Sequence, residues 1–366
     1  MQKADGMNYA PESKNAVRVV APDEFVFAAV GLSHGHIYAM CRGLCEAGAT
    51  LKYVYEKDAA LLSAFLKIYP DVSVAGSEKD ILEDASVRLV ASAEIPNLRA
   101  ALGIRVLRSG KDFYSDKPGM TTFEQLEAVK AAVAASGRKY YVYFGERIHV
   151  ESAIFAQRLI DEGKLGRVLQ VTILAPHRLN KSTRPNWFWD PVQSGEILND
   201  IGSHQFEQFL SYTGAQRASV TASRYANYAN PEHPDFQDFG DVCLLADNGA
   251  AGYCRVDWFT PDGLGAWGDG RVFIMGEKAT VEIRKYIDLA NTNEGDHVLF
   301  TDALGEHRYD VYGTVGFPFF GEFILDCLHR TENSMTQEHV FEAMRLSLEA
   351  AQKAIRIGSM DHCPAL

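Results

Sequence analysis

The stretch SGEILNDIGSHQFEQFL (194–210) carries an acid and an imidazole at a spacing that could do proton chemistry. Its apolar residues recur with the period of a helix, and on such a helix Asp200 and His204 lie one turn apart on the same face. Histidine titrates near neutral pH, so the pair could work as an acid–base couple. It could also be a structural pair, or two ligands of a metal site with no further ligand nearby. The helical pattern alone does not decide among these three interpretations.

A second candidate site follows the predicted strand FVFAAVG (25–31). Small or polar residues stand between this strand and a predicted helix: Gly31, Ser33, His34, Gly35 and His36. Such a loop lets the backbone approach a pyrophosphate, and the helix N-terminus supplies free N–H groups. A Gly-x-Gly-x-x-Gly fingerprint would place glycine at Ser33 and His36, so the loop departs from it twice. An ordinary turn is the alternative.

Glu56 supports the nucleotide interpretation because it ends the next predicted strand, LKYVYE (51–56). At this position of a dinucleotide-binding fold, an acidic side chain binds the adenosine ribose. A carboxylate there favours NAD over NADP, since it would repel a 2′-phosphate, although Lys57 beside it weakens that preference.

Lys117 lies in YSDKPGM (114–120), at the predicted carboxyl end of another strand. Open parallel sheets bind their ligands at this edge. Pro118 biases Lys117 away from helical backbone and fixes the turn. The amine could then bind a substrate oxygen and stabilise developing alkoxide charge, whereas a solvated turn lysine is the alternative.

The elements that must position these residues alternate between strands and helices up to about residue 145. This alternation predicts an α/β fold whose first domain, residues 23–147, is a Rossmann domain with a doubly wound parallel sheet. Residues 1–22 are expected to be a flexible tail. Later strand-like runs follow one another without helices between them, which predicts an α+β domain over 148–366 with a large, mostly antiparallel open sheet.

Length, charge and composition narrow the class of protein. The 366 residues are 47% hydrophobic, which suits two domains with packed cores. A formal net charge of −12 argues against nucleic-acid binding, and no apolar run is long enough for a membrane helix. We see no signal peptide, and the 6 scattered cysteines lack metal-ligand spacing. We therefore expect a cytoplasmic protein that acts on a small molecule.

Two segments together resemble one family. SGKDFYSDKPGMTTFEQLEAVKAAV resembles the Glu-Lys-Pro segment and following helix of the glucose–fructose oxidoreductase / inositol dehydrogenase (Gfo/Idh/MocA) family. GEILNDIGSHQFEQFLSYTG resembles that family's Gly-Gly-x-x-x-Asp-x-Gly-x-His helix, and the likeness runs from about residue 25 to 356. The resemblance implies NAD(P)-dependent oxidation or reduction of a sugar, polyol or related carbonyl compound. It also implies a homodimer or homotetramer held through the sheet of the second domain.

The resemblance assigns roles to individual residues. The family's catalytic lysine falls on Lys117, and its aspartate and histidine fall on Asp200 and His204. With the strand-end arguments above, the residues expected to bind NAD are Gly31, Ser33, His34, Gly35, His36, Glu56, Ala93, Glu94, Pro96, Asp116, Lys117 and Arg147. The residues expected to bind substrate are Lys117, His177, Arg178, Trp189, Asp200 and His204. No metal ion is expected.

The chain also departs from the family's pattern. Asp116 replaces the usual Glu, and Glu196 stands where glycine is frequent. The family's Ala-Thr-Pro-Asn-x-x-His segment reads AEIPNLRA here, which places Glu94 and Arg99 within it. A carboxylate at Glu94, near the cofactor, could alter cofactor affinity.

The expected reaction is a hydride transfer between a substrate C–H and nicotinamide, with His204 as general base, Asp200 orienting its ring and Lys117 holding the reacting oxygen. Two alternatives stay open: an enzyme that cleaves glycosides through transient sugar oxidation, and a non-catalytic NAD-binding regulator. The glycine-rich loop 260–271 around Trp267 is either a mobile flap or a plain hairpin loop.

Overall fold

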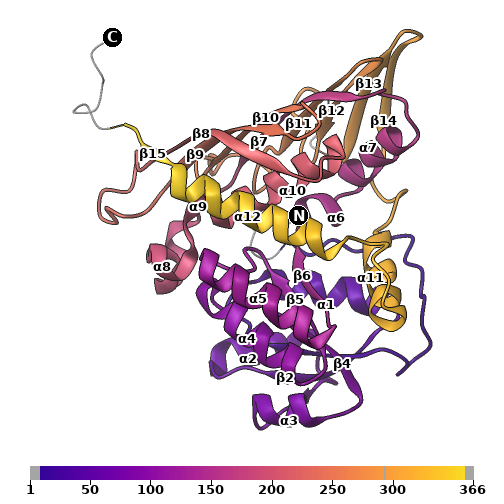
Figure 1. The fold of residues 1–366 in the computed structure, drawn as a ribbon, viewed down its shortest axis with the longest axis vertical. Coiled ribbons are helices and arrows are strands. Elements are labelled where there is room, and N and C mark those ends of the chain that lie inside the picture. The colour runs from indigo at the N-terminus through magenta and orange to yellow at the C-terminus, as the bar shows by residue number, and fades with distance from the viewer. Residues whose placement is uncertain (1–8, 292–293, 359–366) are drawn as a thin grey trace. The chain divides into compact units, whose positions relative to one another are not determined.

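The computed structural model describes residues 9–291 and 294–358, and this part of the chain divides into two compact units (Figure 1). Residues 9–144 and 316–341 form the first unit. The described residues of 145–315, together with 342–358, form the second unit.

The first unit is built on a parallel sheet. Within its described residues, the strands lie in the order β3-β2-β1-β4-β5-β6, and each neighbouring pair is parallel. The strands are β1 Val26–Val30, β2 Thr50–Tyr55, β3 Ser73–Val74, β4 Val87–Ser92, β5 Asp112–Asp116 and β6 Tyr140–Tyr143. The helices are α1 His36–Glu46, α2 Ala59–Ile68, α3 Glu78–Glu83, α4 Pro96–Arg108, α5 Phe123–Ser136 and α11 Pro318–His329. This is the predicted Rossmann arrangement of a doubly wound sheet.

Local sequence explains where these elements begin and end. Helix α4 begins at Pro96, whose missing N–H needs no partner in a first turn. Helix α5 begins after Thr122, whose side chain accepts the N–H of Gln125, and it ends at Gly137 with a φ of 64°. Because these strands are parallel, the loops that follow β1, β2, β4 and β5 leave the sheet at one edge. With the adjoining element ends, they carry the predicted cofactor residues other than Arg147.

Two segments lie differently from the sequence-based expectation. The expected flexible tail is anchored over residues 9–22, because the Val19 N–H donates to the Ala47 carbonyl at 3.0 Å and Val20 is buried. Residues 1–8 of that tail lie outside the described residues. Helix α11 belongs to the first unit rather than the second, because its aromatic side chains pack on β5 and β6. The ring centroid of Phe323 lies 4.9 Å from that of Tyr114 and 4.7 Å from that of Tyr141.

The second unit contains a large mixed sheet. Within its described residues, the strands lie in the order β14-β13-β12-β11-β7-β10-β9-β8-β15, and only the β7–β10 and β8–β15 pairs are parallel. The strands are β7 Val168–Pro176, β8 Ala218–Ala226, β9 Phe239–Ala246, β10 Ala251–Asp257, β11 Arg271–Gly276, β12 Ala279–Arg284, β13 His297–Asp302, β14 Gly305–Asp310 and β15 Ile355–Arg356. The predicted mostly antiparallel sheet is confirmed.

Helices cover one face of this sheet, and its strands alternate accordingly. Helix α10 lies against β7 and β10, and α7 lies against β12 and β13 (Figure 1). Val171 and Ile173 of β7 are buried on the covered face, while Thr172 between them is partly exposed. The remaining helical elements, including 3-10 turns labelled η, are α6 Gly145–Ile148, α7 Glu151–Asp161, η2 Lys181–Thr183, η3 Asn186–Trp189, α8 Pro191–Ser194, α9 Glu196–Asp200, α10 Gly202–Thr213 and α12 Gln337–Lys353.

The single helix predicted over 194–210 is two short helices, α9 and α10, that meet at Ile201. The Ser203 hydroxyl donates to the Asp200 carbonyl at 3.0 Å. The His204 N–H instead donates to the Ile201 carbonyl at 3.2 Å. A serine hydroxyl that takes a helical carbonyl in this way competes with the backbone, and the regular i to i+4 ladder is interrupted there.

Two further features concern the described residues as a whole. None of their helices combines the length and the apolar character that a bilayer crossing would need. Cys41, Cys45, Cys243, Cys254 and Cys327 are free thiols, and Cys363 lies outside the described residues.

Candidate active site

The loop after β1 is held tightly against neighbouring strand ends. The Gly31 N–H donates to the Tyr55 carbonyl at 3.1 Å, and the Gly31 carbonyl accepts the Ala93 N–H at 3.0 Å. Gly31 has a φ of +74°, and a Cβ there would lie 2.8 Å from Cβ of Glu94. Glycine is therefore required both by the backbone conformation and by the close approach of the loop 93–95 after β4, here called the 94 loop.

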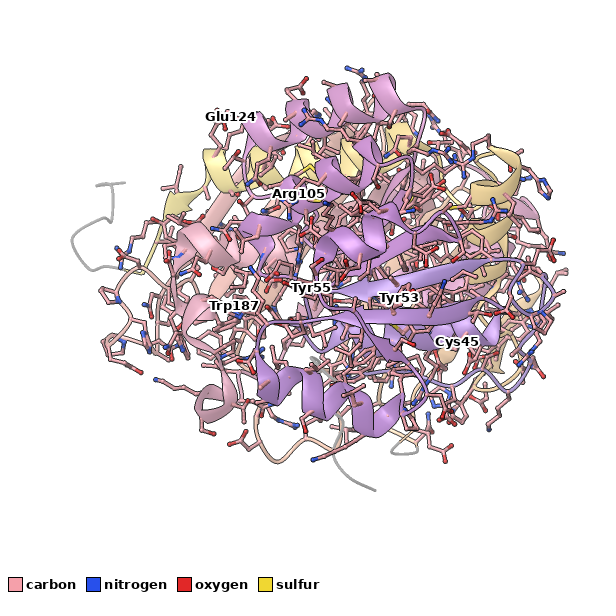
Figure 2. All side chains as sticks on the ribbon, turned by 90° about the horizontal axis from the view of Figure 1, so that it is seen from below. Cys45, Tyr53, Tyr55, Arg105, Glu124 and Trp187 are labelled. Atoms are coloured by element: carbon pink, nitrogen blue, oxygen red, sulfur yellow. The ribbon has the colours of Figure 1, made fainter. Side chains whose placement is uncertain are left out.

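A pocket with a volume of about 190 Å³ opens beside this loop. It is lined by Val30, Gly31, Tyr55, Glu56, Lys57, Glu78, Glu94, Leu98, Ala101, Leu102 and Arg105. Figure 2 shows Tyr55 on β2 and Arg105 on α4 of this unit. Glu56 and Glu94 are thus brought together at the edge where a Rossmann sheet binds its nucleotide.

Both carboxylates already accept hydrogen bonds from the loops. The Leu32 N–H donates to Glu56 Oε2 at 2.6 Å. The Ser33 hydroxyl donates to Glu94 Oε1 at 3.1 Å, and the Ile95 N–H donates to the same oxygen at 2.8 Å. The glycine turn and Glu56 fit the adenosine half of a dinucleotide, whereas Glu94 adds negative charge beside the loop where a pyrophosphate would bind.

A buried network lies at the start of α1. Asp116 receives His36 Nδ1 at 2.8 Å on Oδ1, and on Oδ2 it faces His34 Nδ1 and Arg99 Nη2, each at 3.1 Å. Burial would raise the pKa of Asp116, but His36, Arg99 and His34 hold it well below its ordinary value. Burial and the neighbouring His36 lower the pKa of His34 to about 3.

In the described part of the chain, this is the one group of three His, Cys, Asp or Glu side chains close enough to share a metal ion, with ligand atoms within 4.8 Å of one another. Arg99 already places a positive charge on the same Asp116 carboxylate, which disfavours a second cation there. The sequence prediction of no metal site at His34 and His36 agrees with this charge pattern but is not tested by it.

Arg99 also fixes the Lys117 turn. Its side chain is fully buried, and it donates from Nε to the Glu94 carbonyl at 2.6 Å and from Nη1 to the Lys117 and Pro118 carbonyls. The Lys117 N–H donates to Asp116 Oδ1 at 2.7 Å, and the Lys117–Pro118 peptide is cis. Lys117 is therefore held at the carboxyl end of β5 by a buried guanidinium that the sequence analysis did not assign.

In the second unit, His204 belongs to a buried charged cluster around Glu146. Gln205 Nε2 donates to Glu146 Oε1 at 3.0 Å, and Lys285 Nζ donates to Glu146 Oε2 at 3.1 Å. His177 Nε2 lies 3.6 Å from Glu146 Oε1. Burial would raise the pKa of Glu146, but Lys285, His204 and His177 hold it at about 2. Burial lowers the pKa of Lys285.

The predicted substrate residue His177 thus lies near Glu146, as His204 does. Arg178 instead contacts backbone carbonyls of the loop 260–271. The Arg178 Nη2 group donates to the Leu264 carbonyl at 2.7 Å and to the Ala266 carbonyl at 2.9 Å. Trp267 in the same loop packs on the His177 ring with centroids 4.4 Å apart. The glycine-rich loop 260–271 is therefore fastened to the end of β7, and the substrate role of Arg178 stays a prediction.

Arg147, expected near the cofactor, lies in the second unit at α6. Its Nε donates to Glu207 Oε1 at 2.7 Å and to Glu207 Oε2 at 3.0 Å. Glu207 is fully buried, so this ion pair fastens α6 to α10. A cofactor role for Arg147 stays a prediction.

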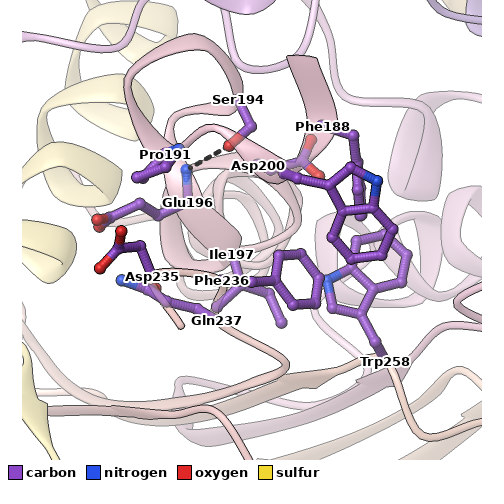
Figure 3. Close-up of a pocket in the computed structure, with 11 residues that line it drawn as sticks. Phe188, Pro191, Ser194, Glu196, Ile197, Asp200, Asp235, Phe236, Gln237 and Trp258 are labelled. Carbon is purple, nitrogen blue, oxygen red and sulfur yellow. Dashed lines mark hydrogen bonds between the residues drawn. The ribbon is translucent and has the colours of Figure 1, made fainter. Parts of the chain in front are cut away.

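Asp200 and Trp189 line a second pocket, which lies beside α9 (Figure 3). Asp200 ends α9, while His204 lies in α10 beside the Glu146 cluster. The structure thus gives the two residues different surroundings, and their acid–base coupling stays a prediction.

Sequence reasoning missed Glu146 and Lys285. Charged residues are usually exposed, and neither residue stands in a motif of the kind that revealed Lys117. The position of Glu146 directly after the last predicted strand of the first domain was the one available signal.

Known proteins are similar to this chain in sequence and in fold. A family model described as the GFO/IDH/MocA C-terminal domain matches residues 154–282. A crystal structure from Erwinia carotovora atroseptica SCRI1043, provisionally described as an oxidoreductase, is 50% identical, with a TM-score of 0.89 over 92% of this chain and 100% of that chain. The chain belongs to the Gfo/Idh/MocA family. The predicted resemblance is confirmed.

More distant similarities match this Gfo/Idh/MocA fold. Levoglucosan dehydrogenase, solved with NADH and levoglucosan, is 16% identical, with a TM-score of 0.74 over 90% of this chain and 98% of that one. The scyllo-inositol 2-dehydrogenase (NADP(+)) of Bacillus subtilis (strain 168) is 26% identical over 155 residues, which is 42% of each chain. The chain spans about two fifths of the length of the curated relatives it matches.

Proposed function

We propose that this Gfo/Idh/MocA protein is an oxidoreductase that transfers a hydride between NAD and a sugar, an inositol-like polyol or a sugar derivative. The observation that carries the proposal is the pocket at the carboxyl ends of β1, β2 and β4, where the Gly31 turn meets Glu56. Rossmann sheets bind dinucleotides at this edge. The bound nicotinamide would supply the hydride acceptor or donor.

The proposal assigns three residues to the chemistry. Lys117 holds the reacting oxygen and stabilises developing negative charge on it. His204 takes the hydroxyl proton in the oxidation direction, and Asp200 favours its cationic form. The support is the turn that Arg99 and Asp116 fix around Lys117, and the anionic Glu146 beside His204.

NAD is the proposed cofactor in preference to NADP. Glu56, Glu78 and Glu94 line the pocket, and the guanidinium of Arg105 is paired with Glu78 at 2.6 Å. Carboxylates at an adenosine site repel a 2′-phosphate. Relatives that use NADH and relatives that use NADP both exist, so the charge of the pocket is the support for this choice.

The test is a fluorescence titration of the protein with NADH and NADPH, followed by an absorbance screen of polyols, aldoses and glycosides with the tighter nucleotide. Net NADH formation from a free sugar or polyol supports the proposal. Aglycone release from a glycoside without net NADH formation would contradict net oxidation and indicate glycoside cleavage. Nucleotide binding with no turnover of any class would contradict catalysis and favour a regulator.

A further inference from the structure

The pocket beside α9 has walls of aromatic rings and a rim of hydrogen-bond acceptors (Figure 3). It is lined by Phe188, Trp189, Pro191, Ser194, Glu196, Ile197, Asp200, Asp235, Phe236, Gln237 and Trp258. None of the described residues that line it is Lys or Arg. Such a lining disfavours anionic ligands and favours a ligand rich in donors.

Glu196 stands in this pocket although its backbone is unfavourable. Its φ is +67°, a region that side chains other than glycine rarely adopt, and Gly195 before it has a φ of 81°. Burial raises the pKa of Glu196, and a hydrogen bond from the Gln237 amide offsets part of that rise. A residue held in a strained conformation is a reason to look for function at that place.

Gln237 supplies the independent observation. Its side chain is 5% exposed, and its Oε1 atom has no hydrogen-bond partner within the part of the chain that the structure describes. Since the carboxylate of Glu196 can only accept, the contact between them identifies the Gln237 nitrogen as the donor. The remaining buried acceptor costs free energy unless a ligand donates to it.

The polar ends of three side chains come together from two segments. Figure 3 shows Glu196 of α9 with Asp235 and Gln237, which precede β9, projecting to the same side of the pocket. An ammonium group carries a positive charge and three N–H donors with no acceptor. Its charge and its donor count match two carboxylates and one amide oxygen.

We propose that this pocket binds the ammonium group of an amino sugar or amino polyol through Glu196, Asp235 and Gln237 Oε1. The choice of a sugar or polyol rests on the proposed function, while the choice of an ammonium group rests on the pocket alone. Asp200 lines the same pocket, so the recognised amine lies beside one of the proposed catalytic residues.

Nearby side chains already cover the aromatic faces. The Arg184 guanidinium lies 4.5 Å from the ring centroid of Phe188 and 4.7 Å from that of Trp258. The His233 ring stacks on Trp189 with centroids 4.0 Å apart. We therefore assign the recognition to the oxygen acceptors, and the rings serve to exclude water and strengthen the charge interaction.

The experiment compares matched ligands that differ in one group: glucosamine with glucose and N-acetylglucosamine, and 1-amino-1-deoxysorbitol with sorbitol. Binding is followed by the intrinsic fluorescence of the protein, since Trp189 and Trp258 line the pocket. NAD-linked turnover is measured separately. We expect each ammonium ligand to bind about tenfold or more tightly than its neutral partner.

Glu196→Gln and Asp235→Asn should each remove most of that preference. Glu196→Gly removes the carboxylate and also relieves the positive φ, so it separates lost recognition from lost folding. Glu306→Gln, on the exposed strand β14, is the matched control and should keep the preference.

The outcomes separate this inference from the proposed function. Ammonium preference without NADH formation contradicts the oxidoreductase but keeps the pocket assignment. NADH formation from neutral sugars, with no ammonium preference in any pair, overturns the pocket assignment and keeps the oxidoreductase. A preference that survives both Glu196→Gln and Asp235→Asn also overturns it.

Discussion

At the scale of single residues, Glu94 is the departure with the clearest physical consequence. Its carboxylate is hydrogen-bonded to Ser33 and Ile95 directly above the Gly31 turn. The backbone of that turn would approach a pyrophosphate, so the Glu94 carboxylate would repel the pyrophosphate of a bound dinucleotide. The sequence indicated the charge, and the structure supplies its position.

Glu94→Gln keeps both hydrogen bonds and removes the charge. We expect NADH to bind about tenfold more tightly to this variant, because one like-charge repulsion is lost. A fluorescence titration with NADH measures the change. Glu124→Gln, an exposed change of the same kind on α5, should leave the affinity unaltered; an equal gain there would indicate a general charge effect instead.

His204 is the residue on which the proposed chemistry depends most. His204→Ala should lose about a hundredfold or more in kcat, the usual contribution of a general base, while NADH affinity persists. Steady-state rates on the preferred substrate, together with the NADH titration, test both halves. Preserved turnover in this variant would contradict the assignment.

At the scale of elements, one arginine of α4 fixes two loops. Arg99 binds carbonyls of the 94 loop and the 117–118 turn and also pairs with buried Asp116. Arg99→Lys keeps the charge but cannot satisfy these acceptors together. We expect it to lower the free energy of unfolding by about 3 kcal/mol, because buried carbonyl acceptors would be left without a donor.

Urea unfolding measures this loss. Arg105→Lys is the control on the same helix: its ion pair with Glu78 is half-exposed, so it should cost at most about 1 kcal/mol. Equal losses for the two variants would mean that burial of Arg99 contributes little.

The Glu146–Lys285 pair joins α6 to the end of β12 and gives the second unit a dependence on acid. Glu146 has a pKa of about 2 in the folded protein against an ordinary value of 4.5. Because the folded pKa is depressed, its contribution to stability is fully present above about pH 4.5 and is lost as the pH falls toward 2. Glu146→Gln should therefore destabilise the protein at neutral pH, and the difference from the parent should shrink over that range.

Urea unfolding of both proteins across this pH range tests the prediction. A difference that stays constant from pH 7 down to 2.5 would show that Glu146 does not titrate as an ion-pair partner.

The local sequence pattern predicted those features of the fold that depend on residues close together in the chain. Alternating apolar runs predicted the parallel sheet, and the proline after Lys117 predicted a fixed turn. The break between α9 and α10 depends on the hydrogen bond from the Ser203 hydroxyl to the Asp200 carbonyl. The periodicity of apolar residues does not reveal this competition with the backbone. The place of α11 depends on aromatic contacts with β5 and β6, far away in sequence.

At the scale of the whole molecule, the described helices leave one face of the large sheet uncovered, and we expect this face to serve self-association, as the family resemblance implies. Phe273 and Met275 on β11 are 39% and 44% exposed, and Leu245 on β9 is 47% exposed. Exposed apolar side chains spread over one face of a sheet favour burial against a partner.

We expect a dimer or tetramer in solution, and Phe273→Glu combined with Met275→Glu should convert it to monomers because the new charges would be buried at the contact. Sedimentation velocity measures the change. Ala131→Glu, on the exposed side of α5 in the first unit, adds charge outside this sheet and should leave the oligomer intact. A monomeric parent protein would contradict the expectation.

The two edges of that sheet limit how it can grow. One edge strand, β14, reads GEHRYD, and the other, β15, is only two residues long. Charged side chains and short length are the means by which sheet proteins prevent a foreign strand from pairing with an open edge. If copies of this chain associate through the sheet, we therefore expect contact between sheet faces and not between edge strands. Growth into fibres by strand-to-strand pairing is disfavoured.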